Sequence, residues 1–345
     1  MPQNRPNINP NDTTTVSNVI STNTPAPTKA LLQIPPAQKV LQTDYHIFQS
    51  FNNCGPAALS MALSHYGITK SQEELGQSLR PWQNPEGIND DKSVTLEEVA
   101  EESKKHGFIP YRRPNGDIEK IKMFITYDMP IITRTWLGPA EDIGHYRVVK
   151  GYNEETKQLI QDDSLQNKNL WYTYDEFNKI WDKFNYEYLV LVPEDKVEIA
   201  ETILGEDTDP KTAWKKAVER SQKTLSENPA DVTARFNLSV AYYNISDYKR
   251  SVEEFEKVES QLPFRTLWYQ IEPIQAYYEV GNYDKVFAIT DGILNYQNLA
   301  YEQAYFVRGK SYQKMEQMDL ARQEFEKAVL YNANLKEANE ALSSI

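Results

Sequence analysis

The chain has 345 residues, 40% hydrophobic and 12% aromatic, and a formal net charge of −13. This length exceeds the roughly 100–200 residues of a usual domain, so we expect two folded units. The acidic balance argues against a nucleic-acid binder, which needs a basic surface, and against binding to anionic membranes. The single cysteine, Cys54, excludes an intramolecular disulfide framework and a thiolate zinc cluster.

Residues 1–43 carry a net charge of +2, seven of the 19 prolines and no aromatic residue. Such a segment buries too little apolar surface to offset its ordering entropy, so we predict a disordered leader, with order beginning near residues 31–35. It has neither the basic nor the apolar region of a signal peptide. No apolar run in the chain approaches the ~20 residues that span a bilayer. Because such leaders often tether a domain, we expect an exported or cell-envelope protein whose signal is absent from this chain; a cytoplasmic protein is the alternative.

Residues 44–195 carry a net charge of −9 and change from helical to extended patterns along the segment. Ser71 and Thr95 are expected helix caps, each with a glutamate three residues later. The extended stretches alternate as strands do, and residues 152–158 form a turn between two of them. Helices first and antiparallel strands second predict an α+β domain. The expected helices are 55–67, 71–79 and 94–108, and the expected strands are 129–136, 145–153, 157–163 and 188–193.

Residues 196–345 carry a net charge of −6 and are helical and repetitive. Tyr242, Tyr277 and Tyr312 are spaced by 35 residues, a period typical of helical repeats. The middle repeat is the weakest, and residues 334–345 are expected to form a capping helix. The segment resembles tetratricopeptide repeats; a generic helical bundle is the alternative, which the recurring period disfavours. The matching packing positions are Leu238, Ser251, Phe255, Val258 and Pro263 around the first tyrosine, and Gly309, Ala321, Phe325 and Ala328 around the last.

The string QSFNNCGPAALSMAL places Cys54 at the first turn of a helix. Unpaired backbone N–H groups and the helix dipole favour a thiolate there. His145, in GHYRVVKGY at the start of a strand, is the best base among four histidines. Asp162 or Asp163, at the end of the next strand, can orient its imidazole, and Gln49 can join the Cys54 N–H in an oxyanion hole. These groups are the parts needed for acyl transfer through a thioester.

The order Q…CGPAA…HY.VV.GY…D resembles the papain-like cysteine peptidases of family 39, whose best-known members are the leader-cleaving domains of bacteriocin-exporting ABC transporters. The resemblance covers residues 45 to about 193. It implies an α+β papain-like peptidase domain at 44–195, followed by an all-α tetratricopeptide-repeat solenoid at 196–345. The chain contains no ABC transporter segment, so the leader peptide is not carried over as the substrate.

The resemblance also implies a role for each residue of the motif. Cys54 is the nucleophile, His145 the general base and Gln49 the oxyanion donor. Asp163 matches the family aspartate, although Ser164 stands where that aspartate is usually followed by proline. Gln49 lies five residues before the cysteine, where six are expected in the transporter-linked enzymes.

These features predict a cysteine peptidase that cleaves peptide or protein substrates and recruits a substrate or partner through its repeats. An inactive scaffold that binds peptides or proteins with the same cleft and repeats is the alternative, in which Cys54 is only a small packed side chain. Acyl transfer to another nucleophile would use the same residues. No metal or phosphate motif appears, so no cofactor is expected. The loop at 80–93 either flanks the cleft or decorates the surface.

Overall fold

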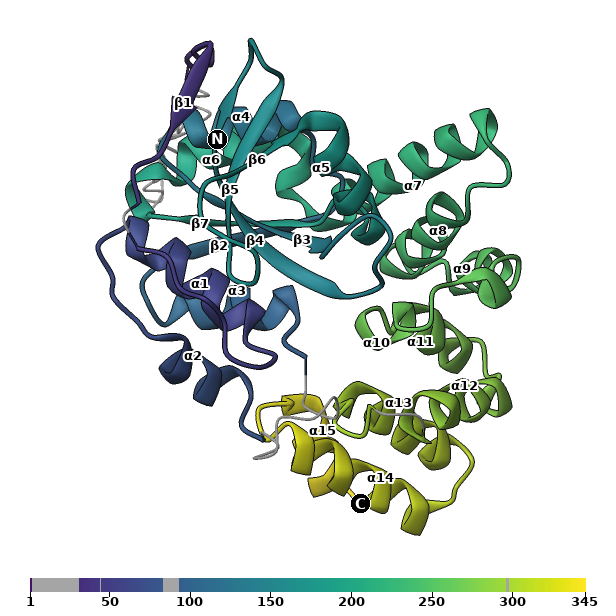
Figure 1. Cartoon of the computed structure of the whole chain (residues 1–345). Coiled ribbons are helices and arrows are strands. Elements are labelled where there is room, and N and C mark those ends of the chain that lie inside the picture. The colour runs from purple at the N-terminus through teal and green to yellow at the C-terminus, as the bar shows by residue number, and fades with distance from the viewer. Residues whose placement is uncertain (2–30, 44, 83–92, 296–297) are drawn as a thin grey trace.

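The computed structural model describes residues 1, 31–43, 45–82, 93–295 and 298–345. Its first part is a sheet region with helices on both sides, and its second part is an arc of helices (Figure 1). The predictions of a disordered leader and of a cleft-flanking loop at 80–93 fall mostly outside the described residues.

The described residues form one antiparallel sheet in the order β2-β7-β3-β4-β5-β6, and β1 pairs with the far end of β4. β4 is the central strand, because β1, β3 and β5 all pair with it. Four of these strands lie where the sequence predicts them, and the α+β class is confirmed. The strands are β1 (Gln38–Val40), β2 (Ile109–Arg113), β3 (Ile131–Trp136), β4 (Gly144–Asn153), β5 (Gln158–Asp163), β6 (Leu170–Thr173) and β7 (Tyr188–Val192).

Side chains alternate between the two faces of the sheet along each strand, and each face carries a cluster of buried apolar residues. On β3, Ile132 packs with the core of the first three helices, and its neighbour Ile131 packs with the core on the opposite face. The sheet therefore lies between two helical layers (Figure 1). The first layer contains α1 (Cys54–His65), α2 (Gln72–Leu79) and α3 (Leu96–Lys104), and the second contains α4 (Ile118–Thr126), α5 (Tyr174–Trp181) and α6 (Val197–Leu204).

The starts of α2 and α3 are fixed by the predicted caps. The Ser71 hydroxyl accepts from the Glu74 N–H at 3.1 Å, and the Thr95 hydroxyl accepts from the Glu98 N–H at 3.2 Å. Each glutamate reaches back to the backbone N–H of its cap residue, which completes a capping box. The predicted caps are confirmed.

The sheet region extends past both predicted limits, 44 and 195. β1 hydrogen-bonds to β4, and Leu41, next to it, is 4% exposed in the core. At the other end, α6 buries Ala200 and Leu204 in the same core. Residues 38–41 follow residues 31–35, where order is predicted to begin, and they belong to the sheet region although they precede residue 44. β1 has only three residues, so its sequence shows too little alternation of apolar and polar side chains to be predicted as a strand. Its strand conformation depends on backbone hydrogen bonds to β4.

The helical part begins after α6 and continues to the C-terminus. Its helices pack in sequence as antiparallel pairs, and α14 is followed by the predicted final helix α15. The helices are α7 (Pro210–Glu227), α8 (Val232–Asn244), α9 (Tyr248–Glu256), α10 (Thr266–Tyr269), α11 (Glu272–Glu279), α12 (Tyr283–Asn295), α13 (Glu302–Lys314), α14 (Met318–Tyr331) and α15 (Lys336–Ser343). Short 3-10 helices lie at η1 (Asp182–Phe184), η2 (Glu194–Lys196), η3 (Gly205–Thr208) and η4 (Glu259–Gln261).

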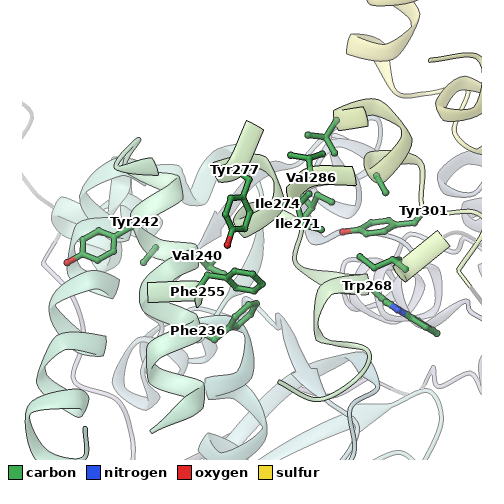
Figure 2. Close-up of a cluster of buried hydrophobic side chains, with 14 of the residues drawn as sticks. Phe236, Val240, Tyr242, Phe255, Trp268, Ile271, Ile274, Tyr277, Val286 and Tyr301 are labelled. Atoms are coloured by element: carbon green, nitrogen blue, oxygen red, sulfur yellow. The ribbon is translucent and has the colours of Figure 1, made fainter. Parts of the chain in front are cut away.

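Most of the predicted repeat positions lie in the core of this part, whereas Pro263 is exposed. Phe255 is fully buried against Phe236 and Tyr277, with ring centroids 6.4 and 6.1 Å apart (Figure 2). In the last repeat Phe325 is also fully buried, and Gly309 lies against its ring. The repeat tyrosines thus mark packing positions between neighbouring helices.

Candidate active site

Cys54 is the first residue of α1, and the rest of that helix is buried as far as Leu63. Such a helix is apolar on every side because it packs between the sheet and two other helices. Cys54 itself is only half-buried, at the end of the helix where backbone N–H groups lack helical partners. The local sequence therefore places one thiol at the edge of an otherwise closed core.

The loop before Cys54 is held by side chains of α2 and its C-cap. Arg80 is 1% exposed and donates to the Phe51 carbonyl at 3.0 Å and to Asn53 Oδ1 at 2.8 Å. Gln72 accepts from the Ser50 N–H at 2.9 Å and donates to the carbonyl of Phe48. Sequence reasoning missed both residues, because a helical pattern does not indicate which polar side chain turns inward.

His145 is buried near the start of β4 and contacts the carboxylate of Asp163. His145 Nε2 lies 3.0 Å from Asp163 Oδ1. Arg147 forms an ion pair with the other carboxylate oxygen at 2.8 Å, and the N–H groups of Leu165 and Gln166 donate to Oδ1. All three charged or polar side chains are at most 2% exposed. Arg147 was not predicted; its position two residues after His145 puts it on the same face of the strand.

Asp162 faces away from His145, as strand alternation requires for neighbours. Its carboxylate forms an ion pair with Lys150 at 2.7 Å and accepts from the Asn169 N–H at 2.8 Å. Of the two aspartates that the sequence left open, Asp163 is the one beside the imidazole.

Gln49 lies beside the first residue after β5. Its side-chain oxygen accepts from the Ser164 hydroxyl at 2.8 Å, and its backbone N–H donates to the Ser164 carbonyl at the same distance. Gln49 lines the same pocket as Cys54 and His145. The structure thus brings all four predicted site residues to one end of the sheet.

Burial sets the protonation states of the site. It raises the pKa of the Cys54 thiol to about 11, although the N–H groups of Gly55 and Tyr146 and the charge of Arg80 act in the opposite direction. Burial also lowers the pKa of His145. For Asp163, burial acts upward, but the hydrogen bond and charge of His145 and the charge of Arg147 hold its pKa well below the ordinary range. The expected thiolate is therefore not favoured in the unliganded protein.

The pocket around Cys54 has walls from both parts of the chain. Its empty volume, open solvent included, is about 760 Å³. The sheet region contributes Gln49, Cys54 and His145, together with Val94 and Ile143, among others. The helical part contributes Trp268, Tyr269, Tyr301, Glu302 and Gln303.

Comparison with protein families decides the nature of the first part. Residues 31–189 match the Peptidase_C39 like family. Residues 302–335 match the tetratricopeptide repeat. The resemblances predicted from the motifs are therefore confirmed: residues 31–189 are similar to a C39-like domain and residues 302–335 to a tetratricopeptide repeat. No curated protein matches the chain in a sequence search.

Two solved structures are similar to parts of the chain. The peptidase domain of Streptococcus ComA, a bi-functional ABC transporter involved in a quorum-sensing pathway, is 24% identical, and the match covers 45% of this chain and 98% of that one, with a TM-score of 0.34. MamA is 17% identical over 41% of this chain and 81% of its own, with a TM-score of 0.35.

In the described ranges, no group of three or more His, Cys, Asp or Glu side chains is arranged to hold a metal ion. None of the helices described is both long and apolar enough to cross a bilayer.

Proposed function

We propose that the chain is a cysteine peptidase in which Cys54, His145 and Asp163 act together. The observation that carries the proposal is the buried His145–Asp163 contact at 3.0 Å in the same pocket as the thiol of Cys54. A carboxylate that holds one imidazole nitrogen leaves the other free to exchange a proton with the nucleophile. The match of residues 31–189 to a peptidase-like family supports the same chemistry.

In the proposed reaction, the Cys54 sulfur attacks the carbonyl carbon of a peptide bond while its proton passes to His145. The low pKa of the buried imidazole keeps it neutral and able to accept that proton. The tetrahedral intermediate then collapses, the C–N bond breaks and His145 returns the proton to the leaving amine. Water hydrolyses the thioester by the same route, with His145 as base.

Gln49 is the proposed oxyanion donor, together with the N–H of Cys54. Its side-chain oxygen accepts from Ser164, which fixes the orientation of the amide. The amide nitrogen is then the end that can donate to a developing oxyanion. Ser164, which replaces the usual proline after the family aspartate, thus has a proposed role in positioning Gln49.

The repeats are proposed to recruit a peptide or protein. Tetratricopeptide repeats build extended surfaces from stacked helix pairs, and such surfaces suit protein ligands. A second candidate function, an inactive peptide-binding scaffold with the same cleft, is favoured by one observation: burial raises the pKa of Cys54 to about 11, against a reactive resting thiolate.

Exposing the protein to a proteome-derived peptide library, with mass spectrometry of the products, tests the proposal. Wild type is expected to cleave a defined set of peptides, and Cys54→Ala none of them. His145→Ala is expected to lose roughly 100- to 10,000-fold in rate, the usual contribution of a general base. Asp163→Asn is expected to lose activity because the imidazole is no longer held by a carboxylate.

Asp162→Asn is the matched control, since Asp162 contacts Lys150 and not His145. It is expected to keep the wild-type rate within a few-fold. If wild type and Cys54→Ala bind the same peptides equally and neither cleaves them, the scaffold function replaces the peptidase.

A further inference from the structure

One helix of the repeats is interrupted, and the short helix before the interruption, α10, lies beside the candidate active site. The 35-residue period would make one continuous helix of α10 and α11, as α8 is in the preceding repeat. Pro273, in the first turn of α11, has no N–H to donate and its ring clashes with the carbonyl four residues earlier, that of Tyr269. The helix therefore ends at Tyr269 and restarts at Glu272, which leaves α10 as a separate element (Figure 1).

The carbonyl released by Pro273 is bound by the sheet region. The Arg134 guanidinium on β3 donates to the Tyr269 carbonyl. The residue before α10, Arg265, binds Asp142 twice, through its backbone N–H at 3.0 Å and its guanidinium at 2.7 Å. Charge-assisted and paired bonds of this kind fix orientation as well as distance. The short helix is thus fastened to the loop and strand beside His145.

Tyr269 lies directly on the backbone of the residue before His145. A Cβ atom built on Gly144 would stand 3.0 Å from two carbons of the Tyr269 ring, closer than ordinary contacts. Only a glycine at this position lets the ring approach without displacement. Tyr269 therefore contacts the start of β4, and with Trp268 it lines the pocket of Cys54.

Beyond the pocket, the repeats are also fastened to the helical side of the sheet region. The Asn334 side chain donates to the Ser78 carbonyl at 2.7 Å, and the Asn332 side chain donates to Glu98 at 3.1 Å. The repeats are thus anchored both on the strand side, through α10, and on the helix side, through the residues after α14.

Tyr301 adds a polar atom to the repeat wall. It is 8% exposed, lines the pocket and lies in the same cluster as Trp268 (Figure 2). Its hydroxyl has no hydrogen-bond partner among the described residues. A buried hydroxyl left unpaired is costly, and a peptide N–H or carbonyl in the pocket would satisfy it.

We propose that the repeats form one wall of the substrate cleft, and that Tyr269 and Trp268 are specificity-determining residues that contact the substrate beside the scissile bond. This rests on the proposed peptidase function and makes the repeats part of the cleft as well as a recruitment surface. Cys54 lies in a pocket that residues of both parts of the chain line, so a bulky ligand surface cannot approach the thiol. The substrate class is therefore an extended, unstructured peptide segment, and the surface of a folded domain does not fit.

The proposal that the repeats form a wall of the cleft can be tested without catalysis. Cys54 is labelled with two reagents, the small iodoacetamide and the bulky fluorescein maleimide. Cys54 is the only cysteine, so the labelled atom is known. The thiolate is the nucleophile that attacks both reagents, so the ratio of the two rates cancels the thiolate fraction and reports steric access. Wild type is expected to favour the small reagent far more than the urea-unfolded chain does. Tyr269→Ala is expected to reduce that preference by roughly tenfold, the scale on which a pocket distinguishes side-chain sizes.

Three further variants distinguish the loss of steric shielding by Tyr269 from a general loss of packing in the repeats. Tyr269→Phe loses the hydroxyl that bonds to the Gly144 backbone but keeps the ring, and should therefore keep the wild-type ratio. Asp142→Asn weakens the anchor to Arg265 and should admit the maleimide more readily. Tyr283→Ala removes a half-buried tyrosine of the repeats outside the pocket, and should leave the ratio unchanged. A ratio that Tyr269→Ala leaves at the wild-type value overturns the proposal.

The peptide library tests the contact with substrate. Tyr269→Ala and Trp268→Ala are expected to change the preference for residues next to the cleaved bond by roughly tenfold, and Tyr283→Ala to leave it unchanged. An unchanged cleavage profile in both pocket variants overturns the specificity role. A wild type that cleaves no peptide contradicts the peptidase function instead, so the two failures are distinguishable.

Discussion

Two opposing effects act on the protonation of the Cys54 thiol: the helix N-terminus favours the thiolate, and burial favours the neutral thiol. A helix N-terminus favours a nearby anion by about 0.3–1 kcal/mol when exposed. Removing a charge from water costs several kcal/mol unless a partner compensates. In this pocket burial dominates, so the pKa of the thiol rises, and the neighbouring imidazole is neutral for the same reason. The resting pair is therefore thiol and imidazole, and the proton moves only during attack.

The pH dependence of Cys54 alkylation follows from this state. A pKa raised to about 11 means a smaller thiolate fraction at neutral pH than in a free thiol, whose pKa is about 8.5. Native protein is expected to react with iodoacetamide more slowly than urea-unfolded protein at about pH 7. Its rate should keep rising with pH after that of the unfolded chain has levelled off. Stopped-time labelling and intact-mass measurement would check this.

The opposite profile would contradict the neutral resting pair. A native rate that exceeds the unfolded rate below neutral pH, and that hardly changes with pH, would indicate a preformed thiolate–imidazolium pair. His145→Ala serves as the comparison, because it removes the only ring that could form such a pair with Cys54 in this pocket, as far as the described residues extend.

Among the helices and strands, local sequence patterns predicted the starts of helices and the repeat period well. They did not predict the shortest strands and helices. The boxes at Ser71 and Thr95 define helix starts through bonds within three residues, so a sequence window contains the whole interaction. β1 and β6 have three and four residues, and α10 has four. Elements this short depend on partners far along the chain, so their own residues carry little signal.

Gly309 gives a prediction at this scale. A Cβ at this position would lie 2.5 Å from two carbons of the Phe325 ring, which is fully buried between α13 and α14. Gly309→Ala is expected to lower the free energy of unfolding by about 1–3 kcal/mol, the usual cost of overpacking. Urea unfolding followed by circular dichroism measures it.

Gly292 is the matched control, since it lies within α12 and a Cβ there would meet nothing within 4 Å. Gly292→Ala should raise the free energy of unfolding by about 0.4–1 kcal/mol, because alanine restricts the unfolded chain. Equal effects of the two substitutions would contradict the packing role of Gly309.

For the whole molecule, the contacts between the two parts are numerous and partly buried. Arg220 of α7 donates to the Gly116 carbonyl at 2.7 Å, and its guanidinium lies 3.5 Å from the centre of the Tyr186 ring. The Asn237 side chain donates to the Asp182 carbonyl at 2.5 Å. With the anchors at α10 and after α14, these contacts join the parts near the first, middle and last repeats.

Cooperative unfolding is the expected consequence. Loss of helix content in urea, followed by circular dichroism, should coincide with exposure of Cys54 to a thiol reagent, because the repeats cover part of its pocket. Asn237→Ala should shift both transitions together to lower urea. Two separated transitions in wild type would show that the parts unfold independently.

The sequence by itself determined the candidate site residues and the resemblance of both parts to known families. Cys54 before Gly-Pro-Ala-Ala, His145 in its strand motif and the tyrosine period are local patterns, and physical constraints within one element produce them. These features were accessible because each depends on neighbours within a short stretch of chain. The sequence left the choice between Asp162 and Asp163 open, and the structure decided it by placing Asp163 beside His145.

Only the tertiary structure decided how the site is surrounded. Arg80 and Gln72 hold the loop before Cys54, and Tyr269 reaches Gly144 from more than a hundred residues away. Burial, which determines the pKa of Cys54, is likewise a property of the assembled walls. Each of these effects arises from chain segments that are distant in sequence and adjacent in space, so no local pattern contains it.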